Sequence, residues 1–264
     1  GGYINGIDLR IGQNGQGKLT FLSGTLTLTD DILIANNDDS YGELNLYGGQ
    51  LTIDDIHIGD ESAGNLNVYD GTYTADVINI GNNDLSNGTL NMIGGNINVT
   101  DELRIADEVD STGNLIQSGG NIEISIAYLG DNSSGYAIFS GGNFTAGTFR
   151  LGNNSGSIGN AIIKSRGLIN TIDFNIGQSI GSTGYLKFLN GEVNATDFNV
   201  ANNGNVHVEM YGGNLNLSDD LRLGDGTNGQ GTFHFYGGNL NIDDIQIGEG
   251  GSGYMTVHSG NINV

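Results

Sequence analysis

The fold of this chain is decided by stretches such as residues 49–71, which read GQLTIDDIHIGDESAGNLNVYDG. Apolar and polar residues alternate in three short runs, residues 50–53, 56–58 and 65–69, and such alternation is typical of strands that bury one face. An Asp-Asp pair separates the first two runs, and glycines close the second and third. The side chains predicted to face the core are Leu51, Ile53, Ile56, Ile58, Leu66 and Val68.

The same pattern returns along the whole chain at intervals of 22 to 25 residues. Each copy is marked by a closing glycine, and these anchors are Gly2, Gly24, Gly49, Gly71, Gly95, Gly120, Gly142, Gly167, Gly191, Gly213, Gly238 and Gly260. The last inward-facing set is predicted to be Leu240, Ile242, Ile245, Ile247, Met255 and Val257. A repeat this short cannot bury its apolar side chains without its neighbours, so it predicts stacked coils.

We therefore expect an all-β fold, a parallel β-solenoid with three short strands in each of about 11 to 12 coils. The handedness of parallel crossover connections favours right-handed coiling. The solenoid is predicted to run as one continuous body over residues 1–264. Because the chain begins and stops within a copy of the repeat, we expect a segment of a longer repeat protein whose open end strands continue or pair with another copy.

Differences in length between the copies fall at two corners of the predicted coil. The distance from the end of the second run to the start of the third is 5 residues in the 22-residue copies, as from Gly12 to Gly17. In the longer copies it is 7 or 8 residues, as from Ala35 to Gly42. Three of the 25-residue copies also carry one extra residue near the Asp-Asp pair. Insertions are thus predicted to be confined to these two corners, where a solenoid tolerates them.

The composition is strongly acidic, with 30 acidic side chains against 8 basic ones and a formal net charge of −22. Nucleic acids and anionic membranes bind basic surfaces, so both are disfavoured as partners. No apolar run approaches 18 residues, so we expect no membrane insertion of this segment. Cysteine is absent, so stability is predicted to depend on core packing and strand hydrogen bonds rather than on disulfides.

The pattern Gly-Gly-x-Leu-x-Leu, Asp-Asp-Leu-x-Leu-Gly, Gly-x-Leu-x-Val-x-Gly-Gly resembles the degenerate strand repeats of bacterial autotransporter passengers and large secreted adhesins. The resemblance covers essentially the whole chain. It implies a right-handed β-helix at or beyond the cell surface. The motif belongs to the fold, so the resemblance transfers no functional residue.

Stacking turns each repeat position into a column of residues from successive coils. The column at the Asp-Asp corner is acidic, and stacked carboxylates repel one another unless a counter-charge is near. Arg10, Arg104, Arg150 and Arg222 share the middle of the second strand and could supply that charge. Bound calcium is the alternative, because it prefers oxygen ligands. The candidate calcium ligands are Asp30, Asp31, Asp54, Asp55, Asp219, Asp220, Asp243 and Asp244.

Two further columns are predicted to face outward. The third strand ends in a column with tyrosines towards both ends of the chain, the pairs Tyr47/Tyr69 and Tyr211/Tyr236. They could form a contact surface for sugar or protein, or stack on each other without a partner. The first strand presents Thr and Asn outward. A regular Thr row would suit ice binding, but the column is mixed, so we predict a solvated surface with stacked amides.

Residues for catalysis are weakly signalled. Pectin-lyase-like enzymes share the expected fold and need a basic residue beside calcium, and Lys164 with Arg166 is the only local basic cluster. We therefore predict that the chain is not an enzyme. The leading hypothesis is an extracellular structural protein, the shaft of a bacterial surface adhesin, passenger or self-assembling filament, with end-to-end or lateral self-association. The alternative is a β-helix that binds or cleaves polysaccharide.

Overall fold

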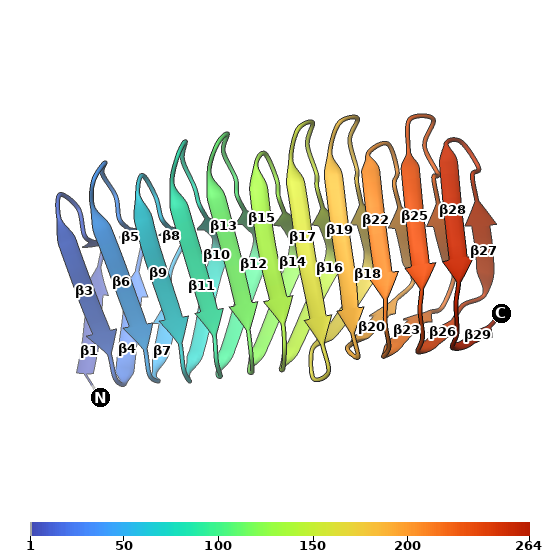
Figure 1. The fold of residues 1–264 in the computed structure, drawn as a ribbon. Helices are drawn as coiled ribbons and strands as arrows, with labels where there is room; N and C mark the ends of the chain where they lie inside the picture. The colour runs from blue at the N-terminus through green and yellow to red at the C-terminus, as the bar shows by residue number, and fades with distance from the viewer. Residues whose placement is uncertain (1) are drawn as a thin grey trace.

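Backbone hydrogen bonds join successive coils in parallel register along the whole rod (Figure 1). In the computed structural model, which describes residues 2–264, Leu51 is paired with Tyr73 on the next coil and Tyr73 with Ile97 on the one after. The fold is an all-β parallel solenoid of about eleven coils. The predicted fold class is confirmed. No helix among the described residues is long and apolar enough to cross a membrane.

The third strand of each coil belongs to an 11-stranded sheet, called sheet B here. Its members are β3 (Gln16–Phe21), β6 (Tyr41–Leu46), β9 (Ala63–Val68), β11 (Asn87–Met92), β13 (Thr112–Gln117), β15 (Ser134–Phe139), β17 (Ile158–Lys164), β19 (Thr183–Leu189), β22 (Asn205–Met210), β25 (Gln230–Phe235) and β28 (Ser252–Val257).

The first and second strands form the 18-stranded sheet A. Its members are β1 (Gly2–Gly6), β2 (Leu9–Ile11), β4 (Gly24–Leu28), β5 (Ile32–Ile34), β7 (Gln50–Thr52), β8 (Asp55–Ile58), β10 (Thr72–Ile80), β12 (Asn96–Ile105), β14 (Asn121–Leu129), β16 (Asn143–Leu151), β18 (Leu168–Ile176), β20 (Glu192–Ala195), β21 (Asp197–Val200), β23 (Asn214–Leu217), β24 (Asp220–Leu223), β26 (Asn239–Asn241), β27 (Asp244–Ile247) and β29 (Asn261–Asn263).

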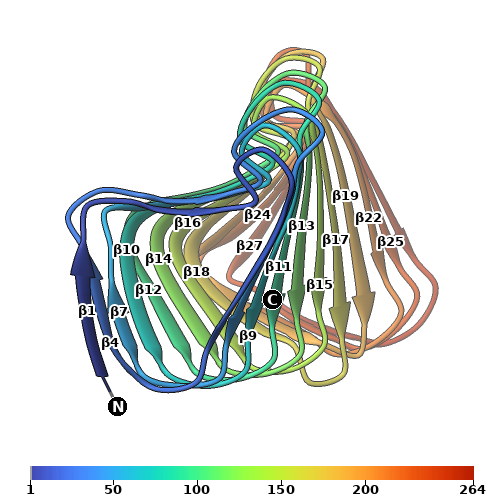
Figure 2. The ribbon, with the colours of Figure 1, turned by 90° about the vertical axis from the view of Figure 1, so that its left-hand side faces the viewer.

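The coils are right-handed, as parallel crossovers favour. In Figure 1 the strands of sheet B run downward on the near side, those of sheet A run upward behind them, and the chain advances from left to right. Figure 2 looks along the rod from its N-terminal end, and the chain turns clockwise as it recedes from the viewer.

In the middle of the rod the first and second strands run on into one bent strand, as in β10, β12, β14, β16 and β18. Most of these coils lack the acidic pair at the corner and carry Ser125, Gly147 or Ile172 there. Where β12 has an extra residue, the pairing with β10 shifts between Val99 and Glu102. The insertions predicted at this corner are therefore absorbed without breaking the sheet.

The core follows the predicted inward positions. All six inward residues expected from residues 49–71 are buried. Phenylalanines stack through the central coils, with ring centroids 4.9 Å apart for Phe149 and Phe174 and 5.0 Å for Phe174 and Phe198. The last set departs from the prediction, because Ile247 and Val257 are 51% and 53% exposed. These residues have a neighbouring coil of this chain on one side only.

The residue that ends the second strand has the same backbone conformation in every coil, with φ between 62° and 74°. This left-handed region suits glycine. At Gly59, for example, an added Cβ would lie 2.3 Å from the Asn87 carbonyl oxygen of the next coil. Three coils hold alanine there, namely Ala35, Ala106 and Ala201.

Five of the six longer loops that follow end in a buried serine, a feature that we did not predict. These residues are Ser40, Ser86, Ser111, Ser157 and Ser182. The hydroxyl of Ser111 donates to the carbonyl of Glu108 at 2.6 Å, and that of Ser157 to Asn154 at 2.7 Å. In all five loops the backbone amide of the serine donates to the carbonyl oxygen three residues earlier, which closes the loop beside the core. The hydroxyls of Ser40 and Ser86 add no such bond. The signal was present in the sequence, because a serine stands two residues before the glycine that opens strand three.

Candidate functional site

The corner between strands one and two, called the acidic corner here, brings Asp31, Asp55 and His57 together near the N-terminal end. Their candidate ligand atoms lie within 4.8 Å of one another. His57 Nε2 is 3.9 Å from an Asp31 carboxylate oxygen. Desolvation by burial raises the pKa of both Asp31 and Asp55, against a smaller lowering effect of His57. Two carboxylates and an imidazole are ligands that a divalent cation can bind.

The same corner near the C-terminal end groups Asp197, Asp219 and Asp220. Here Arg222 lies between carboxylates. One guanidinium nitrogen donates to Asp197 at 2.8 Å, and the other terminal nitrogen pairs with Asp220. Repulsion from Asp220 is the main cause that raises the pKa of Asp219. At this end, the counter-charge comes from arginine.

The other predicted ligands face solvent. Asp30, Asp54, Asp243 and Asp244 are all exposed. Backbone hydrogen bonds connect these residues between neighbouring coils. The amide of Asp54, for example, donates to the Asp30 carbonyl at 3.4 Å. Desolvation is the largest cause that raises the pKa of Asp30, followed by its hydrogen bond with Asp8. These carboxylates form an acidic outer edge rather than a closed cluster.

The predicted arginine column pairs with carboxylates at three of its four positions. Arg10 donates to Asp8 at 2.7 Å, and Arg104 pairs with Glu102 two residues earlier in the same way. Arg150 differs. Its guanidinium lies over the ring of Tyr128, 5.5 Å from the centroid, in a cation–π contact.

Arg104 also reaches two carboxylates in the loops that follow strand two. Its nitrogens lie 3.9 Å from Asp107 and 3.9 Å from Asp131. Burial raises the pKa of Asp107 to about 6, against the lowering effect of Arg104. Burial likewise raises the pKa of Asp131. One arginine thus faces three carboxylates, and desolvation outweighs its charge.

A second buried carboxylate of these loops, Asp60, is held without a cation. It accepts hydrogen bonds from the amides of Asn36 and Asn82 at 2.8 Å each and from Asn83 at 3.2 Å. The donors come from the coils on either side. We did not predict this network, although Asp or Asn directly after the glycine that ends strand two is its signal.

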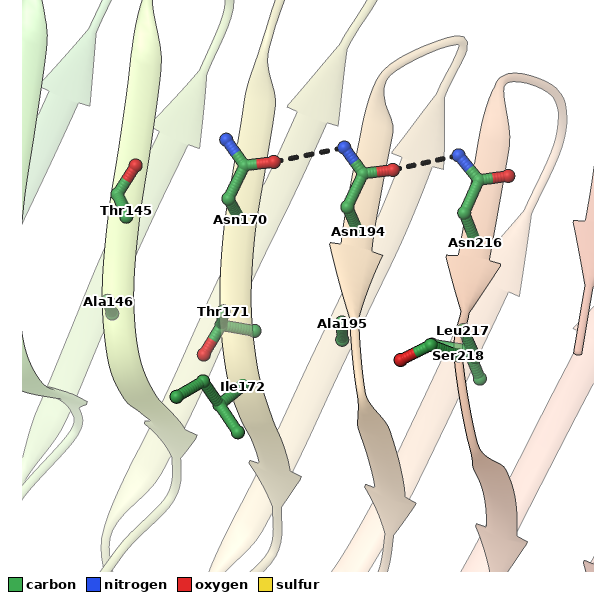
Figure 3. Close-up of a pocket in the computed structure, with 10 residues that line it drawn as sticks. All are labelled: Thr145, Ala146, Asn170, Thr171, Ile172, Asn194, Ala195, Asn216, Leu217 and Ser218. Carbon is green, nitrogen blue, oxygen red and sulfur yellow. Dashed lines mark hydrogen bonds between the residues drawn. The ribbon is translucent and has the colours of Figure 1, made fainter. Parts of the chain in front are cut away.

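Asparagine amides form a continuous row on the outer face of sheet A, called the Asn ladder here. It runs through Asn170, Asn194, Asn216, Asn241 and Asn263, with each amide nitrogen donating to the preceding side-chain oxygen at 2.7 to 3.0 Å. Figure 3 shows three of these residues beside a shallow groove of about 520 Å³. The predicted amide stacking is confirmed. Because these amides satisfy one another, the ladder stiffens the surface.

The predicted tyrosine pairs stack across neighbouring coils. The rings of Tyr47 and Tyr69 are 4.3 Å apart and nearly parallel, with an angle of 1°. Those of Tyr211 and Tyr236 are 4.7 Å apart at 13°. His258 continues the second stack, 4.5 Å from Tyr236. The two pairs lie in one column but in separate parts of the rod, so the structure does not bring all four together.

The basic cluster lies apart from these features. Lys164 ends β17, and Arg166 stands in the turn that follows. Both side chains are exposed. Neither contributes to the acidic corner, the groove or the tyrosine stacks.

Comparisons with protein-family models, curated proteins and solved structures found no match to this chain.

Proposed function

We propose that this chain is a non-enzymatic structural segment, the rigid shaft of an extracellular or cell-surface bacterial protein. The observation that carries the proposal is the unbroken core. Inward side chains are buried in consecutive coils from Ile11 to Ile242. With each coil adding about 4.8 Å, the rod extends roughly 50 Å. Adhesin and autotransporter shafts, which the repeat resembles, need this kind of stiff spacer.

The surface features support the same role. Arg104 and Arg222 each link carboxylates of two neighbouring coils, and the Asn ladder joins side chains across coils. Such contacts resist bending and unstacking, because every coil is held by hydrogen bonds on its outside as well as by its core. The formal charge of −22 opposes lateral clumping of rods.

A coil-deletion variant tests the proposal. Removal of residues 96–142 takes out two coils, from one anchor glycine to another. A shaft should tolerate this loss, so we expect a folded rod about 10 Å shorter by small-angle X-ray scattering, with cooperative thermal unfolding retained.

An enzyme would behave differently. Reducing-end assays on acidic polysaccharides should give no turnover. Release of reducing ends that disappears in Arg166→Ala would overturn the structural proposal and support a polysaccharide-cleaving β-helix.

A further inference from the structure

On the outer face of sheet B, two tyrosines flank one asparagine within a column of otherwise mixed side chains. Tyr136 on β15 and Tyr185 on β19 occupy the same position of their strands. The coil between them places Asn160 of β17 at that position, paired in register with both. Two tyrosines therefore flank one short polar side chain.

The spacing of these two tyrosines leaves room for one ring between them. Adjacent coils are about 4.8 Å apart, so the two tyrosines stand on backbones about 9.6 Å apart. Elsewhere in this molecule, rings on adjacent coils stack at 4.3 and 4.7 Å. A six-membered ring placed above Asn160 would lie about one coil spacing from a tyrosine on either side. We call this space the ring slot. Tyr185 itself meets His207 of the next coil edge-on, with ring centroids 6.5 Å apart at 62°.

A cavity of about 320 Å³ occupies the ring slot. Ile162, two residues after Asn160 on the same strand, lines it beside the asparagine. Polar groups line its C-terminal side, where Lys187 Nζ is 3.2 Å from a Glu209 carboxylate oxygen and His207 Nε2 is 3.5 Å from the other oxygen. The cavity thus combines apolar surfaces with hydrogen-bonding groups, as ligand sites do.

We propose that the ring slot binds one sugar ring of a neutral polysaccharide. The C–H faces of a pyranose pack on aromatic rings, and its hydroxyls pair with an amide, an ammonium and a carboxylate such as those of Asn160, Lys187 and Glu209. The local charges of Lys187 and Glu209 cancel, while the net charge of −22 repels acidic chains. An aromatic side chain of a protein would stack equally well but would leave the polar side of the slot unused.

This inference is independent of the shaft proposal, because a ring slot can serve a rod or an enzyme alike. It is tested by titrating the protein with cellohexaose, mannohexaose and chitohexaose, with binding monitored by calorimetry and by fluorescence. The chain has 11 tyrosines and no tryptophan, so its emission comes from tyrosine. We expect at least one of these neutral oligosaccharides to bind more tightly than an acidic oligogalacturonate.

Two variants locate the binding site. Tyr185→Ala removes one wall and should weaken affinity about tenfold. Asn160→Tyr fills the slot with a tyrosine ring and should abolish binding while leaving the melting temperature equal or higher. The matched control is Tyr69→Ala, which breaks a stacked pair elsewhere on sheet B and should leave affinity unchanged.

Loss of binding in Asn160→Tyr with retention in Tyr69→Ala supports the proposal. Absence of binding to all three neutral oligosaccharides overturns it, as does unchanged affinity in Asn160→Tyr. Direct binding of a phenylalanine-containing peptide that is lost in Asn160→Tyr, without any oligosaccharide binding, would overturn the sugar assignment in favour of a protein partner.

Discussion

The acidic corner has a similar residue pattern near both ends of the rod but a different charge balance. Ile53-Asp54-Asp55-Ile56-His57 and Ser218-Asp219-Asp220-Leu221-Arg222 place a carboxylate pair before an inward residue and an outward one. At the C-terminal corner the outward residue is Arg222, which contacts Asp220 of its own coil and Asp197 of the coil before.

At the N-terminal corner the equivalent residue is His57, whose only ion-pair contact is with Asp31 at 3.9 Å. Burial then raises the pKa of Asp31 and Asp55. The difference teaches that a single outward side chain decides whether the negative charges of two stacked carboxylates are balanced by a nearby positive charge. The C-terminal corner holds one more residue, Ser218, between its inward Leu217 and the acidic pair. The second carboxylate of each pair and the outward residue after it still occupy equivalent positions, so single substitutions can test the comparison.

The largest effect should come from the core beneath the two corners, and it should be equal in both. Ile56 and Leu221 occupy equivalent inward positions and are 2% and 0% exposed. Ile56→Asp and Leu221→Asp each bury an unpaired carboxylate, which costs roughly 4 to 5 kcal/mol. Chemical denaturation should report the same loss for both, and Thr52→Asn on the exposed face should be nearly neutral. Unequal losses would mean that the two corners differ in more than charge.

Removal of Arg222 should make the C-terminal corner resemble the N-terminal one. Arg222→Met leaves Asp197 and the buried Asp220 without their counter-charge. Loss of one partner of a buried pair costs about 3 to 5 kcal/mol, and because the Arg222 side chain is 26% exposed we expect about 2 to 3 kcal/mol.

Arg10→Met is the control for this change, since the pair with Asp8 is more exposed. Its loss should stay below about 1 kcal/mol. Equal destabilisation by the two substitutions would show that arginine packing, rather than charge pairing, is responsible.

A third charge balance lies in the middle of the rod, where Arg104 faces several carboxylates. The pKa of Asp107 is raised to about 6 from 3.8. The folded state therefore binds a proton that the unfolded state releases, and stability falls as pH rises from about 4 to about 6.

Asp107→Asn should remove most of that fall and stabilise the protein by about 2 kcal/mol at pH 7. Urea denaturation at pH 4 and pH 7 measures the free energy of unfolding of both proteins. At pH 4 the variant should be little more stable than the parent. A variant that is less stable than the parent at pH 7 would contradict the assignment.

The smallest effect should come from transfer of the arginine. His57→Arg would place a guanidinium two residues after Asp55 and one coil after Asp31, the arrangement that Arg222 has with Asp220 and Asp197. We expect a gain of about 1 kcal/mol at neutral pH and a lowered pKa of Asp31 and Asp55. NMR titration of the carboxyl groups measures the shifts, and His57→Gln serves as the uncharged control with no gain.

Much of the fold could be predicted because each coil repeats the same alternation of apolar and polar residues. Ile56, Ile58 and Leu66 could be assigned to the core from one coil alone. The loop-closing serines were missed because Ser is an ordinary loop residue, and their value depends on burial beside the core. The continuous sheet A strands β10, β12, β14, β16 and β18 were also missed. A Ser, Gly or Ile at the corner permits either a turn or a bend, so the sequence did not decide between them.

The candidate sites were only partly predictable. The Asp-Asp pairs and the arginine column were visible, but Arg150 turned out to face Tyr128 rather than a carboxylate. The ring slot was not predicted at all. Its tyrosines are separated by 49 residues, and its feature is the short side chain of Asn160 between them.

The sequence by itself determined which side chains face the core, where the coil can accept insertions and that neighbouring coils stack in parallel, because these properties repeat locally in every coil. Only the tertiary structure decided which outward side chains meet. Arg222 contacts Asp197 across 25 residues, whereas Arg150 contacts a ring, and the partner depends on the register and loop lengths of the adjoining coil. Contacts between coils are therefore a property of the stack, since no single repeat contains both partners.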